Sequence, residues 1–371
     1  MAHAVIVGAG IGGLTAAAAL AGQGWSVEVL ERAPSIEPVG SGLAMAPNAL
    51  RALDTIGLGD AVRELSALQG DAGLRRADGG WLSHTSAEAA TARYGDPIVL
   101  LLRSALVGLL AGRLPEGALR LGTEVESVDP ETGEVRAGGQ VTRGDLVVAA
   151  DGIRSRIRGA LFPGHPDPEY AGVTSWRVVV PRSGLDVRAG ESWGRGLIFG
   201  VAPLADNLVY MYGTAVTPAD GRADDERQEL LRLFGGWHDP IPALLRAADP
   251  DKVVRTDIYS METPLPAFHR GRVALLGDAA HAMTPHLGQG ACQAVEDAVT
   301  LAANAGDLAA YTDKRLARTT MVVQRSRRIC RLTTLSNPVA VAARNGFVRL
   351  AGLLGPTAML RQGDAVFNWR P

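Results

Sequence analysis

Three glycines near the N-terminus, Gly8, Gly10 and Gly13, have the spacing of a loop that cradles a phosphate group. They follow a short apolar segment, residues 4–7, so the pattern predicts a strand, a tight turn and a helix. Because glycine has no side chain, the backbone of the turn can approach a pyrophosphate at the helix N-terminus. Taken alone, this spacing is also compatible with a purely structural glycine turn.

A carboxylate at the end of the next predicted strand, residues 26–30, narrows the choice of nucleotide. Glu31 can accept hydrogen bonds from ribose hydroxyls, and its charge would repel a 2′-phosphate. Together with the adjacent Arg32, it is a candidate cofactor contact. The order strand, turn, helix, strand and glutamate predicts an adenine dinucleotide, with NADP disfavoured at this site.

Two further motifs distinguish FAD from NAD. Asp151 follows the apolar segment 145–150, and Asp278 follows the apolar segment 272–276. Each segment is short and bounded by polar residues, as buried parallel strands are. Both aspartates therefore follow the ends of predicted buried strands.

Three segments together carry a resemblance to a known family. They are the N-terminal loop, residues 149–155 (AADGIRS) and residues 271–297 (GRVALLGDAAHAMTPHLGQGACQAVED). On these segments the sequence resembles the class A flavoprotein monooxygenases, the para-hydroxybenzoate hydroxylase superfamily. Residues 170–176 especially resemble the salicylate hydroxylase and urate hydroxylase branch. The resemblance is weakest at residues 71–96 and after Asn337.

The resemblance implies non-covalent FAD as the cofactor. Asp278 would bind the ribityl chain, since a carboxylate accepts hydrogen bonds from hydroxyls. Gly288 and Gly290 would open a helix whose N–H groups stabilise negative charge on the reduced flavin pyrimidine. Arg103 would contact FAD from a helix start, or be a surface arginine. Asp151 would lie against the cofactor, or cap the following helix.

The same resemblance implies a mobile flavin ring. The small residues of segment 40–43, including Gly42, match the loop beside which the ring swings inward and outward. Pro285 matches the proline whose backbone lines the oxygen-reacting side of the flavin. Swinging would expose the ring to NADH or NADPH as a transient reductant, so no second nucleotide-binding fold is needed, and none is visible.

Candidate substrate contacts lie in predicted strands and beside the flavin helix. Tyr210 and Tyr212 are two residues apart, so they share one face of a strand, as substrate contacts or as core aromatics. Arg177 would anchor an anionic or oxygen-rich substrate, or form a salt bridge within the sheet. His286 is a candidate general base or hydrogen-bond donor, or a structural histidine, whereas His281 is expected to hydrogen-bond behind the loop.

The reaction that the resemblance implies is hydroxylation of a small aromatic or polycyclic substrate. NAD(P)H would reduce FAD, O2 would form a C4a-hydroperoxyflavin, and its distal oxygen would pass to an electron-rich carbon. A flavin dehydrogenase without oxygen transfer and a nonenzymatic flavin-bearing module are the alternatives. A halogenase is disfavoured, because Trp176 lacks the second tryptophan of a Trp-x-Trp pair and no lysine precedes Lys252.

The elements that must position these residues predict an α/β protein. We expect a Rossmann-like FAD-binding domain with an inserted antiparallel-sheet substrate domain. The FAD-binding domain would comprise residues 1–70, 97–165 and 270–371, the last with C-terminal helices. The substrate domain would comprise residues 71–96 and 166–269.

Amino-acid composition limits the partners, metals and disulfides that we expect for this chain. The chain has 371 residues, a net charge of −2 and 47% hydrophobic residues, which favours small-molecule partners over nucleic acid or a membrane. Two cysteines, Cys292 and Cys330, are too few for a disulfide framework, and no cluster has metal-ligand spacing, so we expect no metal. We expect a cytoplasmic monomer or homodimer.

Two late segments are expected to be helical. Residues 338–360 predict a packing helix with Arg344 and Arg349 turned outward. The basic run 314–331, which includes Arg315, predicts a solvated helix face, with phosphate attraction or a subunit contact as the alternatives.

Overall fold

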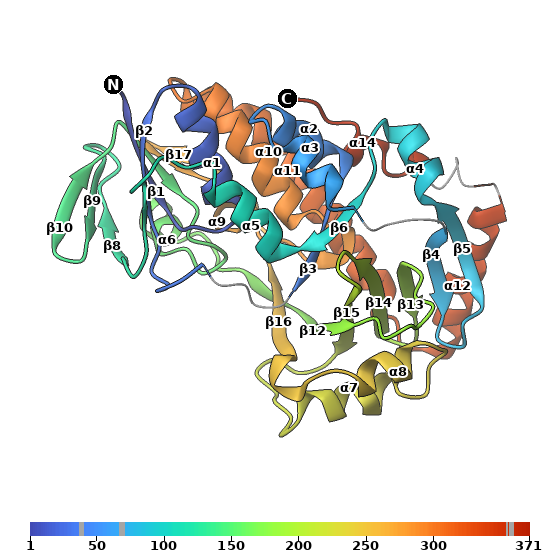
Figure 1. Ribbon diagram of the computed structural model, residues 1–371. Coiled ribbons are helices and arrows are strands. Elements are labelled where there is room, and N and C mark those ends of the chain that lie inside the picture. Colours follow the sequence, from blue (N-terminus) through green and yellow to red (C-terminus); the bar gives the residue numbers. More distant parts are fainter. Residues whose placement is uncertain (37–40, 67–70, 354, 356–359) are drawn as a thin grey trace.

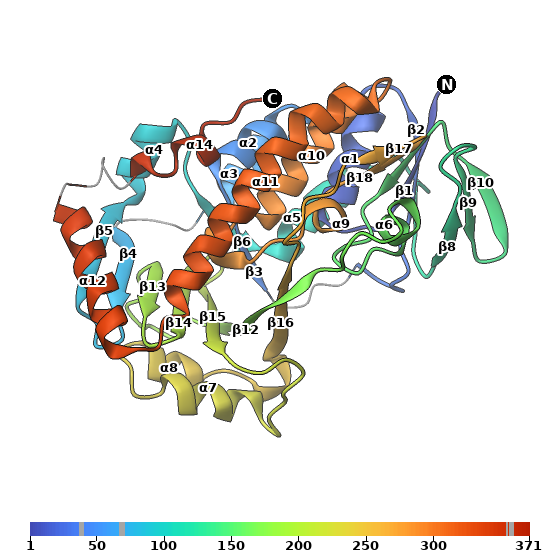
Figure 2. The same ribbon diagram turned by 180° about the vertical axis from the view of Figure 1, so that it is seen from behind.

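Two large sheets form the framework of the chain (Figure 1). The computed structural model describes residues 1–36, 41–66, 71–353, 355 and 360–371. Gly40, which belongs to the predicted flavin loop, lies outside the described residues. The long helix α11 (Leu308–Thr333) runs from the six-stranded sheet toward the seven-stranded sheet (Figure 2).

The six-stranded sheet has the predicted parallel arrangement. The N-terminal strand lies between the next strand of the chain and a strand that is distant from it in sequence. Within this sheet only β17 is antiparallel to its neighbour. In order, the strands are β17 (His269–Arg270), β18 (Val273–Leu275), β11 (Leu146–Ala149), β1 (His3–Val7), β2 (Ser26–Leu30) and β7 (Leu119–Arg120).

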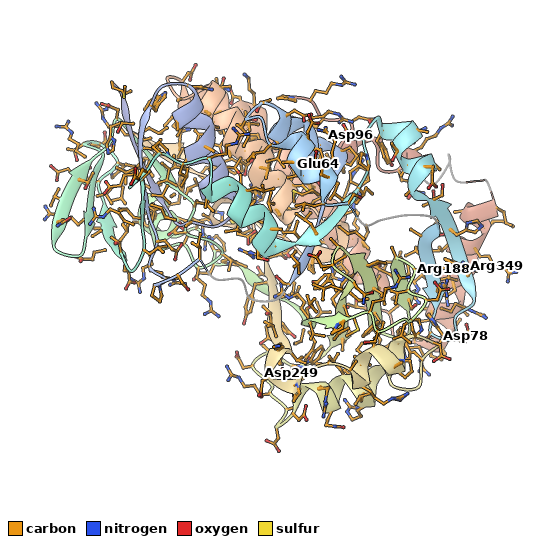
Figure 3. All side chains as sticks on the ribbon, in the orientation of Figure 1. Glu64, Asp78, Asp96, Arg188, Asp249 and Arg349 are labelled. Carbon is orange, nitrogen blue, oxygen red and sulfur yellow. The ribbon has the colours of Figure 1, made fainter. Side chains whose placement is uncertain are left out.

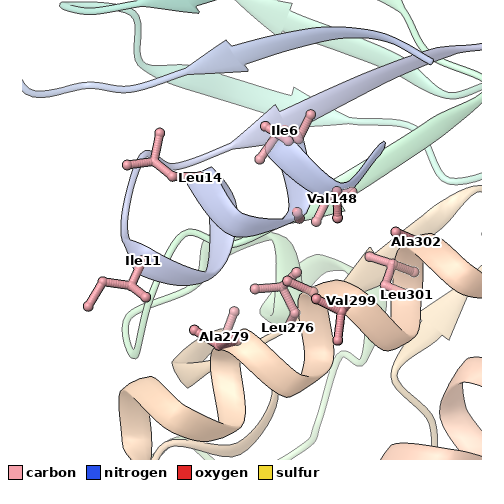
Figure 4. Close-up of a cluster of buried hydrophobic side chains, with 14 of the residues drawn as sticks. Ile6, Ile11, Leu14, Val148, Leu276, Ala279, Val299, Leu301 and Ala302 are labelled. Atoms are coloured by element: carbon pink, nitrogen blue, oxygen red, sulfur yellow. The ribbon is translucent and has the colours of Figure 1, made fainter. Parts of the chain in front are cut away.

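The core of this half lies between the sheet and two helices, α1 (Ile11–Gly22) and α10 (Gly290–Ala303). Figure 4 shows side chains from both helices and from the strands gathered in one cluster. Strands β1 and β11 are buried on both faces, which explains why their sequences are almost continuously hydrophobic.

The seven-stranded sheet is antiparallel except at one position. Strand β4 lies parallel to β13, a pairing that the sequence did not predict and that joins two distant segments. In order, the strands are β16 (Val254–Ser260), β12 (Glu169–Pro181), β15 (Leu208–Val216), β14 (Leu197–Leu204), β13 (Gly190–Trp193), β4 (Asp71–Arg76) and β5 (Trp81–Ser86).

The two faces of this sheet have different neighbours. Helices α7 (Glu226–Phe234) and α8 (Ile241–Arg246) cover one face, where Trp176 and Phe199 are buried against Phe234. Because side chains alternate along a strand, Arg177 must point to the opposite face. That face is directed toward the six-stranded half.

Two small sheets and several helices complete the fold. Strands β8 (Val125–Val128), β9 (Glu134–Ala137) and β10 (Gln140–Arg143) form a sheet that the sequence did not predict, and β3 (Gly42–Met45) pairs with β6 (Val99–Leu102). The helices are α2 (Pro47–Asp54), α3 (Gly59–Glu64), α4 (Ala87–Tyr94), α5 (Arg103–Ala111), α6 (Arg156–Leu161), α9 (Asp278–His281), α12 (Pro338–Leu353) and α14 (Asp364–Phe367). The predicted α/β class is confirmed, and no helix in the described ranges is long and apolar enough to cross a membrane.

Two predictions about charged helix faces were wrong. Arg315 is fully buried, because α11 turns it toward Glu296 and Asp297 of α10. Arg344 is also buried: its guanidinium donates to the carbonyl of Gly194 at 3.0 Å and lies over the ring of Trp193. A charged residue was predicted to face solvent in each case because its partners are distant in sequence.

The contrast between Arg344 and Arg349 on α12 can be tested. We expect Arg344→Ala to lower the free energy of unfolding by about 1–3 kcal/mol, since it removes the cation over Trp193 and a donor to a backbone carbonyl. Arg349→Ala, on the exposed side of the same helix, should change it by no more than about 0.5 kcal/mol. Urea unfolding of both variants measures the difference, and equal effects would contradict the packing role of Arg344.

Candidate active site

The N-terminal turn is built from close backbone approaches. A Cβ on Gly8, whose φ is +103°, would lie 2.4 Å from the carbonyl oxygen of Ala150. A Cβ on Gly13 would lie 2.0 Å from the carbonyl oxygen of Gly8. Gly10, the N-cap of α1, has no atom within 4 Å of such a Cβ, which leaves open space at the helix N-terminus. The geometry is that of a turn prepared for a phosphate.

Glu31 completes this turn at the end of β2. Its Oε2 accepts a hydrogen bond from the N–H of Ala9 at 2.7 Å, and its Oε1 accepts one from the N–H of Ala33 at 2.8 Å. A carboxylate has further lone pairs, so these bonds fix it while leaving capacity for ribose hydroxyls. Arg32 is exposed beside it.

The second predicted motif lies at the same edge of the sheet, beyond β11. Asp151 Oδ2 accepts from the N–H of Ile157 at 3.3 Å, while its Oδ1 is buried without a partner. Ser155 is the N-cap of α6, since its Oγ accepts from the N–H of Arg158 at 2.9 Å. Asp151 thus assists the helix start with one oxygen and leaves the other available.

The third motif brings charged groups together from three elements. Asp278 remains accessible to solvent, but the protein around it desolvates its carboxyl and raises its pKa, against the opposing charges of His281 and Arg103. Desolvation lowers the pKa of Arg103; the charge of Arg177 lowers it further, and that of Asp278 raises it. Asp278, Arg103 and Arg177 therefore share one electrostatic neighbourhood.

The start of α10 presents free backbone donors. Residues Pro285–Leu287 form one turn of 3₁₀ helix, and Gly288 follows in the left-handed region at φ +61°. No side chain caps α10, which begins at Gly290 and has no acidic residue in its first turn. Its first N–H groups can therefore face a negatively charged group.

A buried polar network holds this helix start, and the sequence did not reveal it. Asn48 donates to Gln289 Oε1 at 3.0 Å and to Glu296 Oε1 at 2.6 Å. Gln293 bridges the same two side chains at 3.0 Å to each. The sequence offered only their positions as a signal. Gln289, Gln293 and Glu296 lie in the 271–297 segment that carries the resemblance, and Asn48 lies at the start of α2.

The ionic part of the network reaches the Gly277 loop. Arg315 Nε donates to Asp297 at 2.6 Å, and the other oxygen of Asp297 accepts from the N–H of Gly277 at 2.9 Å. Burial opposes ionisation of Asp297, but the charges of His281 and Arg315 hold its pKa below the usual range. His281 lies 2.5 Å from Asp297, so the prediction that it hydrogen-bonds behind the loop is confirmed.

The predicted substrate residues share one face of the seven-stranded sheet. Tyr212 is paired with Arg177 across β12 and β15, and Tyr210 lies two residues away. The Tyr210 ring fills the space beside Gly42, where a Cβ would lie 2.5 Å from its Cγ. The Tyr212 hydroxyl donates to Glu191 at 2.5 Å, which satisfies it within the protein.

Arg177 on this face and His286 in the 3₁₀ turn before α10 keep unused polar atoms. Arg177 donates to Thr256 Oγ1 at 2.8 Å rather than to a carboxylate, and its Nε is buried without a partner. Neither ring nitrogen of His286 has a partner, and desolvation lowers the pKa of His286 to about 4. His286 is therefore neutral near pH 7 and can accept a hydrogen bond from a ligand.

Two structural contacts of the site were missed. A Cβ on Gly12 would lie 2.6 Å from Leu276 Cδ1, so this glycine permits the close packing of α1. Arg158 is buried and donates to the carbonyls of Ala279 and Ile153 at 3.2 and 2.9 Å, which links the second and third motifs. No group of His, Cys, Asp and Glu within the described part of the chain could hold a metal ion.

The site fits FAD on its own geometry. The turn at Gly10 has room for a pyrophosphate, and the N–H groups of α10 suit the pyrimidine of a flavin. Asp151 Oδ1 and Gln289 Nε2 are buried polar atoms without partners, as expected where a ligand supplies them. A parallel sheet with these features defines a flavin-binding scaffold.

Known proteins agree with this class. Residues 1–326 match the family described as FAD binding domain. The chain is 39% identical over 366 residues to the aurachin C monooxygenase/isomerase of Stigmatella aurantiaca, with 93% of each chain covered. It is 32% identical over 348 residues to the FAD-dependent urate hydroxylase of Klebsiella pneumoniae, with 89% of this chain and 90% of the relative covered.

A solved structure supports the same class of protein. The crystal structure of Klebsiella pneumoniae HpxO complexed with FAD and uric acid superimposes with a TM-score of 0.88 and 28% identity, covering 97% of this chain and 95% of the other. The chain belongs to the FAD-binding-domain family, among the class A flavoprotein monooxygenases, and its cofactor is FAD.

The close contact at Gly13 gives a direct test of the FAD site. We expect Gly13→Ala to weaken FAD binding at least about tenfold, which corresponds to about 1.4 kcal/mol, because its methyl group must displace Gly8. Gly22→Ala, at the other end of α1, meets nothing within 4 Å and should leave FAD binding unchanged. Flavin fluorescence titration measures both, and unchanged affinity in Gly13→Ala would contradict the assignment of this turn.

Proposed function

We propose that the protein is a single-component monooxygenase that uses NAD(P)H and O2 to hydroxylate a small aromatic or polycyclic substrate. The observation that carries the proposal is the proximity of the two halves of the site. Tyr210, from the seven-stranded sheet, packs against Gly42, where a Cβ would lie 2.5 Å from its Cγ, and the charge of Arg177 lowers the pKa of Arg103. A substrate held on that sheet would therefore lie beside the flavin-binding residues.

The residues of the chain would bind and orient the cofactor as follows. FAD, when bound, supplies electron transfer from NAD(P)H and activation of O2. Glu31 and Asp278 accept from its hydroxyls, while the N-terminus of α10 stabilises negative charge without reorganising. Pro285 and Gly42 border the ring, and the contact of Gly42 with Tyr210 brings the substrate face against it.

The substrate side chains indicate a ring with an ionisable O–H or N–H group. Arg177 would attract an anionic or oxygen-rich ring through its unpartnered Nε. Neutral His286 would accept the proton whose removal makes the ring carbon more nucleophilic. Tyr210 and Tyr212, whose ring centroids are 5.7 Å apart, would form the apolar wall that excludes water.

Turnover experiments separate this function from its alternatives. With a panel of phenols, purines and polycyclic metabolites, we expect at least one compound to accelerate NADH or NADPH oxidation, with one atom of isotope-labelled O2 in the product. Oxidation of the reductant without labelled product would instead indicate a dehydrogenase. No NAD(P)H oxidation with any compound would indicate a nonenzymatic flavin module.

The low pKa of His286 predicts the acid limit of activity. If neutral His286 accepts a proton, kcat/KM should fall as the pH drops toward about 4 and show no acid limb near 6.5. His286→Gln should lower kcat/KM by about 10²-fold and lack this limb, while flavin fluorescence still shows FAD bound. A pH–rate profile of both proteins between pH 4 and 8 tests the role; identical profiles would contradict it.

The lowered pKa of His286 also makes the stability of the folded protein depend on pH. The unfolded chain binds the proton with an ordinary histidine pKa, whereas the folded chain resists it until about pH 4. Stability is therefore lost as the pH falls from about 6.5 to about 4. Circular dichroism at each pH must accompany the rate measurements, so that unfolding is not mistaken for loss of catalysis.

A further inference from the structure

Helix α12 carries apolar side chains on two opposite faces. One face packs against the seven-stranded sheet, where Val348 is buried with Leu82 and Ile198. The other face lies at the outer edge of the molecule, beyond β4 and β5 (Figure 2). Four large apolar residues on that face have 65–76% of their surface exposed, and we call them the α12 stripe: Val339, Phe347, Leu350 and Leu353.

The α12 stripe is one continuous surface. Together with Ala343 and Gly346, which are also exposed, its members recur every three or four residues along the helix. That spacing places them on one side of the helix. Isolated exposed apolar residues are ordinary, whereas a contiguous group of them indicates contact with another apolar surface.

Basic residues border the α12 stripe. Residues 314–363 contain ten basic residues and no aspartate or glutamate. Arg349 is exposed on α12 itself, and Figure 3 labels it at the outer edge of the molecule. Arg331 is exposed in the last turn of α11, and the carbonyl of the next residue lies 3.5 Å from Nη1 of Arg344. The basic end of α11 therefore lies against α12.

No carboxylate balances the two exposed arginines. Within the ranges that the structure describes, neither Arg331 nor Arg349 forms an ion pair. The carboxylates of neighbouring segments have partners of their own, namely Asp78 with Arg76, Asp364 with Arg93, and Glu88. The surface around the α12 stripe is therefore both apolar and positively charged.

A second copy of the chain fits this surface poorly. In a two-fold interface the same patch meets itself, so Arg349 would face a positive patch that has no acidic residue to pair with it. An anionic lipid surface instead offers negative phosphates beside an apolar interior. Amphipathic helices with basic borders bind such a surface while lying in its plane.

We propose that α12 docks the protein reversibly on an anionic lipid surface. The α12 stripe enters the boundary between headgroups and acyl chains, while Arg331 and Arg349 contact lipid phosphates. The net charge of −2 for the whole chain did not indicate this partner, because it averages the basic C-terminal region with the acidic residues elsewhere.

Flotation of the FAD-loaded protein with lipid vesicles tests the docking. The probes are vesicles of phosphatidylglycerol and phosphatidylcholine in equal parts, and vesicles of phosphatidylcholine alone. We expect at least about tenfold tighter binding to the anionic vesicles. Replacing both Phe347→Ser and Leu350→Ser should weaken it at least about tenfold, and Arg349→Gln about fivefold.

Exposed residues of the same kinds, distant from α12 in the fold, provide the controls. Val141→Ser on β10 and Arg156→Gln on α6 should bind anionic vesicles within about twofold of the parent. Flavin fluorescence and turnover of the aromatic panel should be unchanged in every variant, because none of these residues belongs to the flavin site. Loss of docking is then distinguished from loss of folding.

Each outcome decides the proposal. No binding to anionic vesicles, equal binding to both kinds of vesicle, or binding that the Phe347→Ser and Leu350→Ser variant leaves unchanged overturns it. Equal weakening in a control variant also overturns it, because that result indicates general adsorption. Light scattering covers the second copy: a dimer that the same variant converts to a monomer, without vesicle binding, assigns the α12 stripe to self-association instead.

Discussion

The buried ion pairs between α10 and α11 are the interaction on which the site depends. Arg315 is fully buried and bonds both Glu296 and Asp297, while Arg318 also bonds Glu296. Buried charges are costly unless each finds a partner, and removing one partner leaves another charge uncompensated. Because Asp297 also accepts from Gly277, the loop after β18 and the start of α10 are held by one group of charges.

This network gives the flavin-facing helix a fixed position. Glu296 connects through Asn48 and Gln293 to Gln289, the N-cap residue of α10. Side chains joined by several shared hydrogen bonds resist displacement more than isolated bonds do. Fixed N–H dipoles can stabilise charge on a reduced flavin without first reorienting, which is the condition for efficient electrostatic stabilisation.

The sequence predicted those parts of the protein whose causes are local. The βαβ opening, the motifs at Asp151 and Asp278 and most strands of the second sheet were recognisable from short patterns of glycine, charge and apolar residues. The parallel pairing of β4 with β13 and the contact of Gly42 with Tyr210 were not, because each joins segments distant in sequence. Arg315 was wrongly placed in solvent for the same reason.

Strand β13 shows how one short segment can serve two environments. Side chains alternate across a strand, so Glu191 points toward Tyr212 while the next residue, Ser192, points toward His238. Burial raises the pKa of Glu191, against hydrogen bonds from Tyr212 and Trp193. Each polar side chain is bonded on its own face, so a substitution at Ser192 need not break the bonds of Glu191. The two faces of the sheet therefore keep separate hydrogen bonds while sharing one backbone.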